Sequence, residues 1–273
     1  AAFQGMPRGH PLVLPPPYEY RRVGATLFLV RADSTRLARA LPESLRPAPG
    51  FARRLLIAVL DNREVACTND PTGSLYSYKE IVLAAVVSPR ERHWDTPIGL
   101  YPLVVYVDDD TALAVGREVY GFAKKMAEIE VGSAFARLRR KGRLETTAGE
   151  QALVPIALLD IEWRKRASPA TIDGSAHVVL RKLLSMGIFN ELALPPTAGA
   201  PSDDAPHTTL TWIKPSGVRT EQLRWLTGIK LRVQPSVTDP IWRLLGREPG
   251  VTHGLRLDFC FSIGEGRVLE EIA

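Results

Sequence analysis

Two adjacent lysines, Lys124 and Lys125, lie within residues 114–131, a stretch whose other members are largely apolar. Burying a lysine is costly unless the ammonium group is paired or loses its proton, and a second cation beside it raises that cost. A lysine that has lost its proton attacks carbonyl compounds. The pair therefore suggests amine catalysis, and a solvated pair on a turn or helix face is the alternative interpretation.

The chemistry open to such an amine is imine formation. A free lysine is only about 0.04% neutral at pH 7, so a catalytic lysine needs surroundings that favour the neutral amine. The neutral amine adds to a ketone, and loss of water then gives a protonated imine. That imine accepts the electrons left behind when a bond next to the former carbonyl carbon breaks.

A second candidate group, Leu-Tyr-Ser-Tyr-Lys-Glu at residues 75–80, comes just before an apolar run. In an extended strand Tyr78 and Glu80 point to the same side, because side chains alternate between the two faces. Together they could exchange protons with an imine or a carbinolamine in a pocket. The alternative is a surface turn in which Glu80 pairs with an arginine.

The elements that position these groups are mostly short apolar runs typical of strands. Such runs occur at residues 25–31, 55–60, 81–87, 103–107, 129–131, 210–213, 228–233 and 255–263. A short helix is indicated after Asp33 or Ser34, either of which can cap it, and it ends before Pro42. Many strands and few helices predict an α+β fold, mostly antiparallel β, with a barrel-like or sandwich-like core.

Other segments shape the expected domain organisation. Residues 1–17, rich in proline and glycine, predict an extended N-terminal arm, and residues 18–273 a single domain. Lys141-Gly142 is the expected turn of a hairpin, and residues 151–163 fit either a strand or a helix. Residues 93–99 read as a loop, and the polar stretch 195–207 reads as a mobile one.

Composition excludes several classes of protein. No apolar run reaches the roughly 18 residues of a membrane helix. The scattered histidines and the distant Cys67 and Cys260 offer no metal-ligand spacing, and reduced cysteines favour a cytoplasmic location. The net charge of +5, carried by 27 arginines and eight lysines, fits a site that attracts small anionic acids. The basic residues 137–143 read as a strand end with solvated charges, so no nucleic-acid partner is expected.

The two candidate motifs together resemble the acetoacetate decarboxylase superfamily. Ala-Val-Gly-Arg-Glu at residues 114–118, a short aromatic spacer and Lys124-Lys125 are similar to its signature, and Tyr78-Lys79-Glu80 is similar to its Tyr-x-Glu. The established example of a lysine activated by a cationic neighbour is acetoacetate decarboxylase itself. The resemblance implies that Lys124 forms the Schiff base, Lys125 helps keep it neutral, and Glu80 acts as the acid, assisted by Tyr78.

The resemblance also implies the type of enzyme. It points to a cofactor-free lyase that acts on a small oxo acid, and relatives that assemble imply a homo-oligomer. An arginine would receive the substrate carboxylate in bidentate geometry, with Arg117, Arg21 and Arg22 as candidates. Tyr120 and Phe122, in the spacer before the lysines, are further expected substrate contacts.

Some positions depart from the decarboxylase pattern. Ala123 replaces the proline common before the lysine pair, Val23 falls in the best gapless match where decarboxylases have an early arginine, and residues 55–58 are apolar where they have a second glutamate. These departures leave the imine-forming lysine in place and open two alternatives. One is an aldolase-dehydratase or cyclase acting on pyruvate-like 2-oxo acids, and the other is a non-catalytic protein that binds a small acid.

Overall fold

The computed structural model describes residues 14–90, 98–145, 151–165, 186–193, 208–236, 239–264 and 266–272. Strands dominate this part of the chain. In chain order they are β1 (Tyr18–Arg31), β2 (Leu45–Pro47), β3 (Arg54–Cys67), β4 (Leu75–Pro89), β5 (Gly99–Val107), β6 (Lys124–Met126), β7 (Glu128–Val131), β8 (Phe135–Glu145), β9 (Gln151–Lys165), β10 (Gly187–Ala193), β11 (Thr208–Ile213), β12 (Ser216–Val233), β13 (Val251–Ile263) and β14 (Arg267–Ile272).

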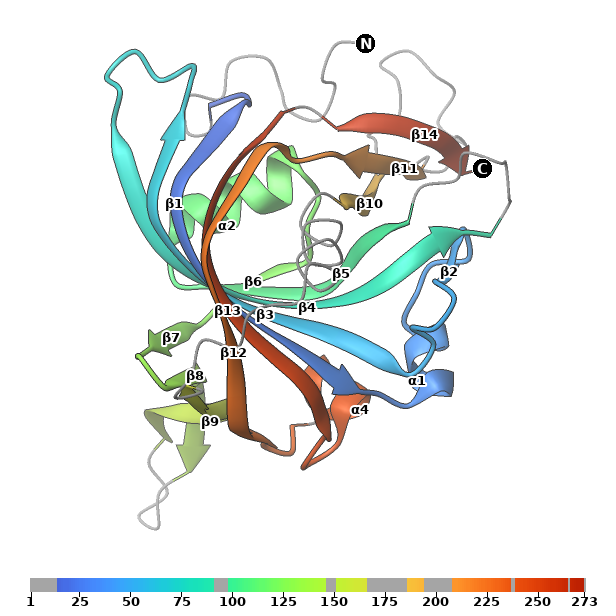
Figure 1. Cartoon of the computed structure of the whole chain (residues 1–273), viewed down its shortest axis with the longest axis vertical. Helices are drawn as coiled ribbons and strands as arrows, with labels where there is room; N and C mark the ends of the chain where they lie inside the picture. Colours follow the sequence, from blue (N-terminus) through green and yellow to red (C-terminus); the bar gives the residue numbers. More distant parts are fainter. Residues whose placement is uncertain are drawn as a thin grey trace.

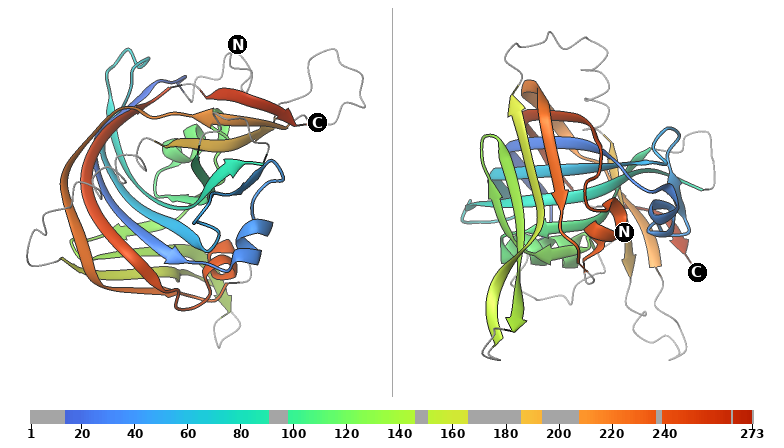
Figure 2. Two further views of the ribbon diagram at one scale, coloured as in Figure 1. Left: turned by 45° about the vertical axis from the view of Figure 1, so that its right-hand side comes forward. Right: turned by 90° about the horizontal axis from the view of Figure 1, so that it is seen from below.

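These strands form one curved sheet, which Figures 1 and 2 show from three sides. Its order is β14-β11-β10-β5-β4-β3-β1-β13-β12-β9-β8-β7, with β2 paired to β4 and β6 paired to β5. The pairs are antiparallel except β10 with β5 and β5 with β6. The predicted, mostly antiparallel fold is therefore confirmed.

The sheet is open in its strand order, but it curls back on itself at β6. This strand lies beside β5 and continues through Ala127 into β7, at the far end of the strand order. Ala127 N–H donates to Val107 O over 2.9 Å, which holds the junction against β5. The long strands thus curve around an interior in which a short helix lies, as Figure 2 (left) shows.

The two faces of β3 and β4 have different roles, and both are largely apolar. Odd-numbered residues such as Leu55, Ile57, Ile81 and Leu83 are fully buried in the main hydrophobic core. The even-numbered residues face a cavity on the other side of the sheet. Because both faces are largely apolar, the sequence of each strand reads as a continuous run rather than an alternation.

The described α-helices are α1 (Ser34–Arg39), α2 (Asp110–Ala114) and α4 (Pro240–Leu245), and the π-helix η1 (Val115–Val119) follows α2 directly. The predicted first helix is confirmed, and the Asp33 carboxylate caps it by accepting from Arg36 N–H over 2.8 Å. α1 and α4 lie side by side, joined by a bond of 3.0 Å from the Arg36 guanidinium to Arg243 O. No helix in the described ranges is long and apolar enough to span a membrane.

One local prediction is wrong. Lys141-Gly142 is not a hairpin turn, because β8 runs through it and pairs Lys141 with Pro155 and Gly142 with Val154. Continuous pairing with β9 holds the glycine in extended backbone. β9 also decides between the two interpretations of residues 151–163 in favour of a strand. Residues 1–13 of the predicted arm, 93–97 and 195–207 lie outside the described residues.

Candidate active site

A cavity of about 170 Å³ lies between the even-numbered face of β3 and β4 and the segment that runs from α2 through η1 to β6. Its lining is largely apolar and aromatic, with residues from β1, β5 and β13 completing the walls. Among the described residues that line it, Lys124 and Glu80 are the only charged side chains. No described group of three or more histidine, cysteine, aspartate or glutamate side chains is placed to hold a metal ion.

Lys124 and Glu80 form an ion pair inside this cavity. The Lys124 Nζ lies 3.0 Å from the Glu80 Oε2, and their side chains are 6% and 12% exposed. The Tyr78 ring centroid lies 5.5 Å from the same Nζ, close enough for a cation–π interaction. The structure therefore brings together three of the residues that the sequence singled out, although Lys124 and Glu80 are 44 positions apart in the sequence.

Strand register places the pair. Lys124 in β6 is the partner of Val105 in β5, and Glu80 in β4 is the partner of Val107 in the same strand. β5 therefore lies between the two strands, and because the partner positions Val105 and Val107 are two residues apart, both side chains point to the same face. Tyr78 and Glu80 share a face because they are two residues apart in a strand, as the sequence predicted.

Gly116 leaves the space that the Lys124 side chain occupies. A Cβ atom at this position would lie 2.2 Å from the Lys124 Cε and 2.9 Å from its Nζ. The glycine belongs to η1, and π-helical turns are often found at functional sites. Gly116 O also accepts from Phe122 N–H over 2.8 Å, which ties η1 to the spacer before the lysines. The glycine of the Gly-Arg-Glu motif thus makes room for Lys124, because a side chain at this position would collide with it.

Two tyrosine hydroxyls meet beside the ion pair. The Tyr78 and Tyr20 oxygens lie 3.1 Å apart and share a hydrogen bond. Burial, followed by the neighbouring Tyr20 and Glu80, holds the pKa of the Tyr78 hydroxyl well above its ordinary value. Burial, followed by Tyr76 and Glu80, does the same for the pKa of Tyr20. Both hydroxyls stay protonated at neutral pH and can donate hydrogen bonds.

Lys125 lies outside the cavity. Adjacent side chains of a strand point to opposite faces, so Lys125 leaves β6 on the side away from Lys124. Its Nζ lies 4.0 Å from Asp239 Oδ2, and its side chain is 40% exposed. Asp239 is buried and accepts from the Tyr106 hydroxyl, whose oxygen lies 2.6 Å from both carboxylate oxygens. The structure therefore gives Lys125 a partner of its own on the other face.

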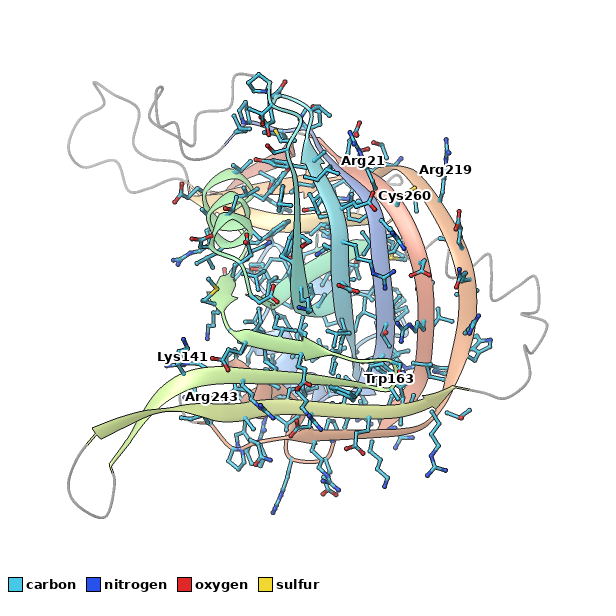
Figure 3. All side chains as sticks on the ribbon, turned by 90° about the vertical axis from the view of Figure 1, so that its left-hand side faces the viewer. Arg21, Lys141, Trp163, Arg219, Arg243 and Cys260 are labelled. Carbon is cyan, nitrogen blue, oxygen red and sulfur yellow. The ribbon has the colours of Figure 1, made fainter. Side chains whose placement is uncertain are left out.

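The arginines expected to bind a carboxylate also lie elsewhere. Arg22 is exposed and pairs with Glu64 at 3.5 Å, and Arg117 is exposed on η1. Arg21 pairs with Glu19 at 2.9 Å, and Figure 3 shows it on the outer surface near Arg219 and Cys260. The register of β1 with β3 and β13 shifts between Tyr20 and Val23, so the consecutive Arg21 and Arg22 can both be exposed, and Arg117 lies on the outward face of η1. In contrast, Tyr120 and Phe122 line the cavity, with their rings stacked 5.6 Å apart.

Comparison with known proteins decides the family. The acetoacetate decarboxylase (ADC) family model matches residues 6–272, nearly the whole chain. The chain belongs to the acetoacetate decarboxylase family. A curated acetoacetate decarboxylase from Ralstonia nicotianae is 33% identical over 122 residues, which is 43% of each chain. The match therefore spans less than half the length of that relative.

Solved structures show that the fold is acetoacetate decarboxylase-like. The acetoacetate decarboxylase from Legionella pneumophila superposes with a TM-score of 0.72 at 16% identity, over 97% of this chain and 92% of that one. The enduracididine biosynthesis enzyme MppR, complexed with pyruvate, gives a TM-score of 0.67 at 15% identity, over 96% and 93%. At these identities the likeness concerns the fold.

Several cavity residues of this family member were missed in the sequence. Tyr20, Phe259 and Phe261 line the cavity from β1 and β13, and the alternation of apolar residues along β13 was the available signal. Asn62 of β3 also lines it and is 1% exposed, and neither its amide nitrogen nor its oxygen has a partner among the described residues. No local pattern marks Asn62, because the strand before it is simply apolar.

Proposed function

We propose that this protein is a Schiff-base-forming lyase in which the Lys124 amine attacks the ketone of a small oxo acid. The observation that supports this proposal is the buried Lys124 Nζ, 3.0 Å from the Glu80 carboxylate in a largely apolar cavity. Imine formation needs a neutral amine, a group that takes its proton, and limited access of water. Glu80 is placed to take the proton, and the largely apolar walls limit the access of water.

The proposed reaction begins with proton transfer from Lys124 to Glu80. The free amine adds to the ketone, and the resulting carbinolamine loses its oxygen as water with the proton that Glu80 holds. The protonated Tyr78 hydroxyl, which shares a hydrogen bond with Tyr20, is assigned to the carbinolamine oxygen as a donor. The product is a protonated imine on Lys124 beside an ionised Glu80.

For a β-keto acid, the imine then accepts the electron pair of the bond to the carboxylate carbon. Carbon dioxide leaves, and an enamine remains on Lys124. Glu80 takes a proton from solvent and delivers it to the enamine carbon, and water hydrolyses the new imine to release the ketone. Atoms and charge balance without a redox step.

A second candidate function is aldol condensation and dehydration of a pyruvate-like 2-oxo acid. The observation that favours it is the β3 face, which presents Leu56, Ala58 and Leu60 to the cavity rather than a second carboxylate beside Glu80. In this reaction the imine loses a proton from its methyl group to Glu80, and the enamine carbon attacks an aldehyde. The structural likeness to MppR, which was crystallised with pyruvate, is in keeping with it.

Borohydride trapping tests the proposal. The protein is incubated with acetoacetate or with pyruvate, reduced, and analysed by intact mass and peptide mapping. We expect one adduct, on Lys124, that is absent from Lys124→Ala and retained in Lys141→Ala, whose lysine is 68% exposed on β8 (Figure 3). Absence of any adduct on Lys124 would contradict the proposal and favour a protein that only binds small acids.

The two reactions differ in their products. Release of carbon dioxide and acetone from acetoacetate supports decarboxylation, whereas an unsaturated condensation product from pyruvate and an aldehyde supports the second candidate. Assembly into a homo-oligomer, implied by the family, stays a prediction that light scattering tests.

A further inference from the structure

Aromatic rings form a continuous row along one wall of the cavity, contributed by β4, β1 and β13. We call the side chains of Tyr76, Tyr78, Tyr20, Phe261 and Phe259 the aromatic row. Tyr76 stacks on Tyr78 with centroids 6.0 Å apart, and Tyr78 meets Tyr20 through their hydroxyls. Tyr20 stacks on Phe261 at 4.4 Å, and Phe261 stacks on Phe259 at 5.1 Å, with planes 6° and 7° from parallel.

The side chains of the aromatic row are less buried than those of the main hydrophobic core. Four of its five side chains, all but Tyr78, are only partly buried, although each lines the cavity. Leu27, Leu60 and Val82, which also line it, are partly buried as well. When an apolar group covers apolar surface that is accessible in a cavity, the free energy falls, because that surface is removed from water. The wall is therefore built to receive an apolar group.

The charges of the cavity give a carboxylate little to bind. Lys124 and Glu80 are the only charged side chains among the described lining residues, and they already pair with each other. Arg22 and Arg117 are exposed and do not line it. Burying a carboxylate without a cationic partner is costly. Among the described lining residues, affinity therefore comes mainly from apolar contact, with the imine cation as the remaining attraction for an acid.

We propose that the substrate is a carbonyl compound that carries a planar apolar group, of about the size of a phenyl ring, packed against the aromatic row. This inference rests on the proposed imine chemistry of Lys124 and names the class of compound that reaches it. A cavity of about 170 Å³ is large enough for one ring, since an engineered cavity of about 150 Å³ binds benzene. Parallel rings favour offset stacking of a flat group.

Two matched pairs of carbonyl compounds test this substrate class. Butan-2-one and 4-phenylbutan-2-one differ by a phenyl group, and so do pyruvate and phenylpyruvate. Borohydride trapping is measured against carbonyl concentration, and each value is normalised to trapping of n-butylamine, which removes differences in intrinsic reactivity. Within each pair we expect the phenyl compound to reach half-maximal trapping at a concentration at least about tenfold lower than its partner.

Variants locate the phenyl group. Phe261→Ala should reduce the phenyl preference to below about threefold, and Phe261→Leu, which keeps an apolar side chain but removes the ring, should reduce it in part. Phe135→Ala is the matched control, because Phe135 of β8 packs on Arg137 and does not line the cavity. Thermal unfolding shows that each variant is folded, and the ratio within a pair is unaffected by a general loss of trapping.

Each outcome decides one claim. Adducts with all four compounds and no phenyl preference would overturn the inference while leaving the proposed function intact. A preference that survives both Phe261 variants would overturn the placement on the aromatic row. No adduct with any compound would contradict the proposed function itself. A preference in both pairs that falls in Phe261→Ala and persists in Phe135→Ala supports the inference.

Discussion

Lys124 and Lys125 are neighbours in the chain, but their ammonium groups have separate partners on opposite faces of β6. The Lys124 Nζ lies 3.0 Å from Glu80 in the cavity, and the Lys125 Nζ lies 4.0 Å from the buried Asp239. Each lysine thus forms an ion pair with a different carboxylate. The geometry connects Lys125 to the anchoring of α4, where Asp239 caps the helix through Ile241 N–H.

Replacing Lys125 should therefore affect stability more than chemistry. In Lys125→Met the apolar stem is kept and the charge near Asp239 is lost. We expect the free energy of unfolding to fall by about 1 kcal/mol or less, since Lys125 is 40% exposed at 4.0 Å and the buried Asp239 keeps its hydrogen bonds from the Tyr106 hydroxyl and Ile241 N–H. Denaturant unfolding measures this change, and trapping at Lys124 should persist. Loss of trapping without loss of stability would show that Lys125 does act on Lys124, as the family resemblance implies.

Glu80→Gln should slow imine formation. Glutamine keeps the shape and a hydrogen-bond acceptor near Lys124, but it cannot take the proton that the amine must lose. Positioned acid–base groups typically contribute about 10²–10⁴-fold, so we expect the single-turnover trapping rate to fall by that order. Glu64→Gln is the control, because the Glu64 side chain is 40% exposed, pairs with Arg22 and does not line the cavity. A Glu80→Gln rate equal to the wild-type rate would remove Glu80 from the mechanism.

Gly116→Ala should displace the Lys124 amine while the fold persists. The added methyl group would lie 2.2 Å from the Lys124 Cε, and the flexible lysine side chain can move away more easily than the backbone. We expect trapping to fall at least tenfold, with a change in melting temperature of only a few degrees. Gly264→Ala, where the added Cβ meets no atom within 4 Å, is the matched control. Wild-type trapping in Gly116→Ala would refute this role.

Stability should fall at alkaline pH. Burial raises the pKa of Tyr20 and Tyr78 well above 10, and burial with the Asp239 hydrogen bond raises the pKa of Tyr106. Above pH 10 the unfolded chain releases these protons and the folded chain keeps them, so the unfolded state is favoured as pH rises. The contribution is complete below pH 10 and is lost progressively above it.

Denaturant unfolding between pH 8 and pH 11 measures this loss. Tyr106→Phe removes one of the hydroxyls whose pKa is raised, so its stability should fall less steeply above pH 10, although the variant starts less stable because Asp239 loses a donor. Parallel curves for the wild type and Tyr106→Phe would contradict the assignment to Tyr106.

Asn62→Leu should stabilise the protein. The amide of Asn62 is buried with no partner among the described residues, and each unsatisfied buried polar group costs about 1–3 kcal/mol. A leucine of similar size removes that cost next to Leu60 and Tyr78. We expect the free energy of unfolding to rise by about 1 kcal/mol, measured by denaturant titration. A decrease would show that the amide has a partner, such as bound water, that the leucine cannot replace.

Much of the fold could be predicted because its signals are local. The apolar runs of β3, β4 and β13 mark strands by composition alone, and Asp33 marks the start of α1 by its capping chemistry. The motif around Lys124 and the alternation of Tyr78 with Glu80 were equally readable. These features depend on neighbours within a few residues, which a single sequence displays directly.

Only the tertiary structure decided which faces meet. The register of β6 on β5 separates Lys124 from Lys125, the outward faces of β1 and η1 remove Arg22 and Arg117 from the cavity, and the pairing of β1 with β13 stacks Tyr20 on Phe261. The sequence by itself determined most of the strands and the candidate amine. The cavity wall and the partners of each charge depended on pairing between residues far apart in the chain, and the alternation within one strand leaves that pairing open.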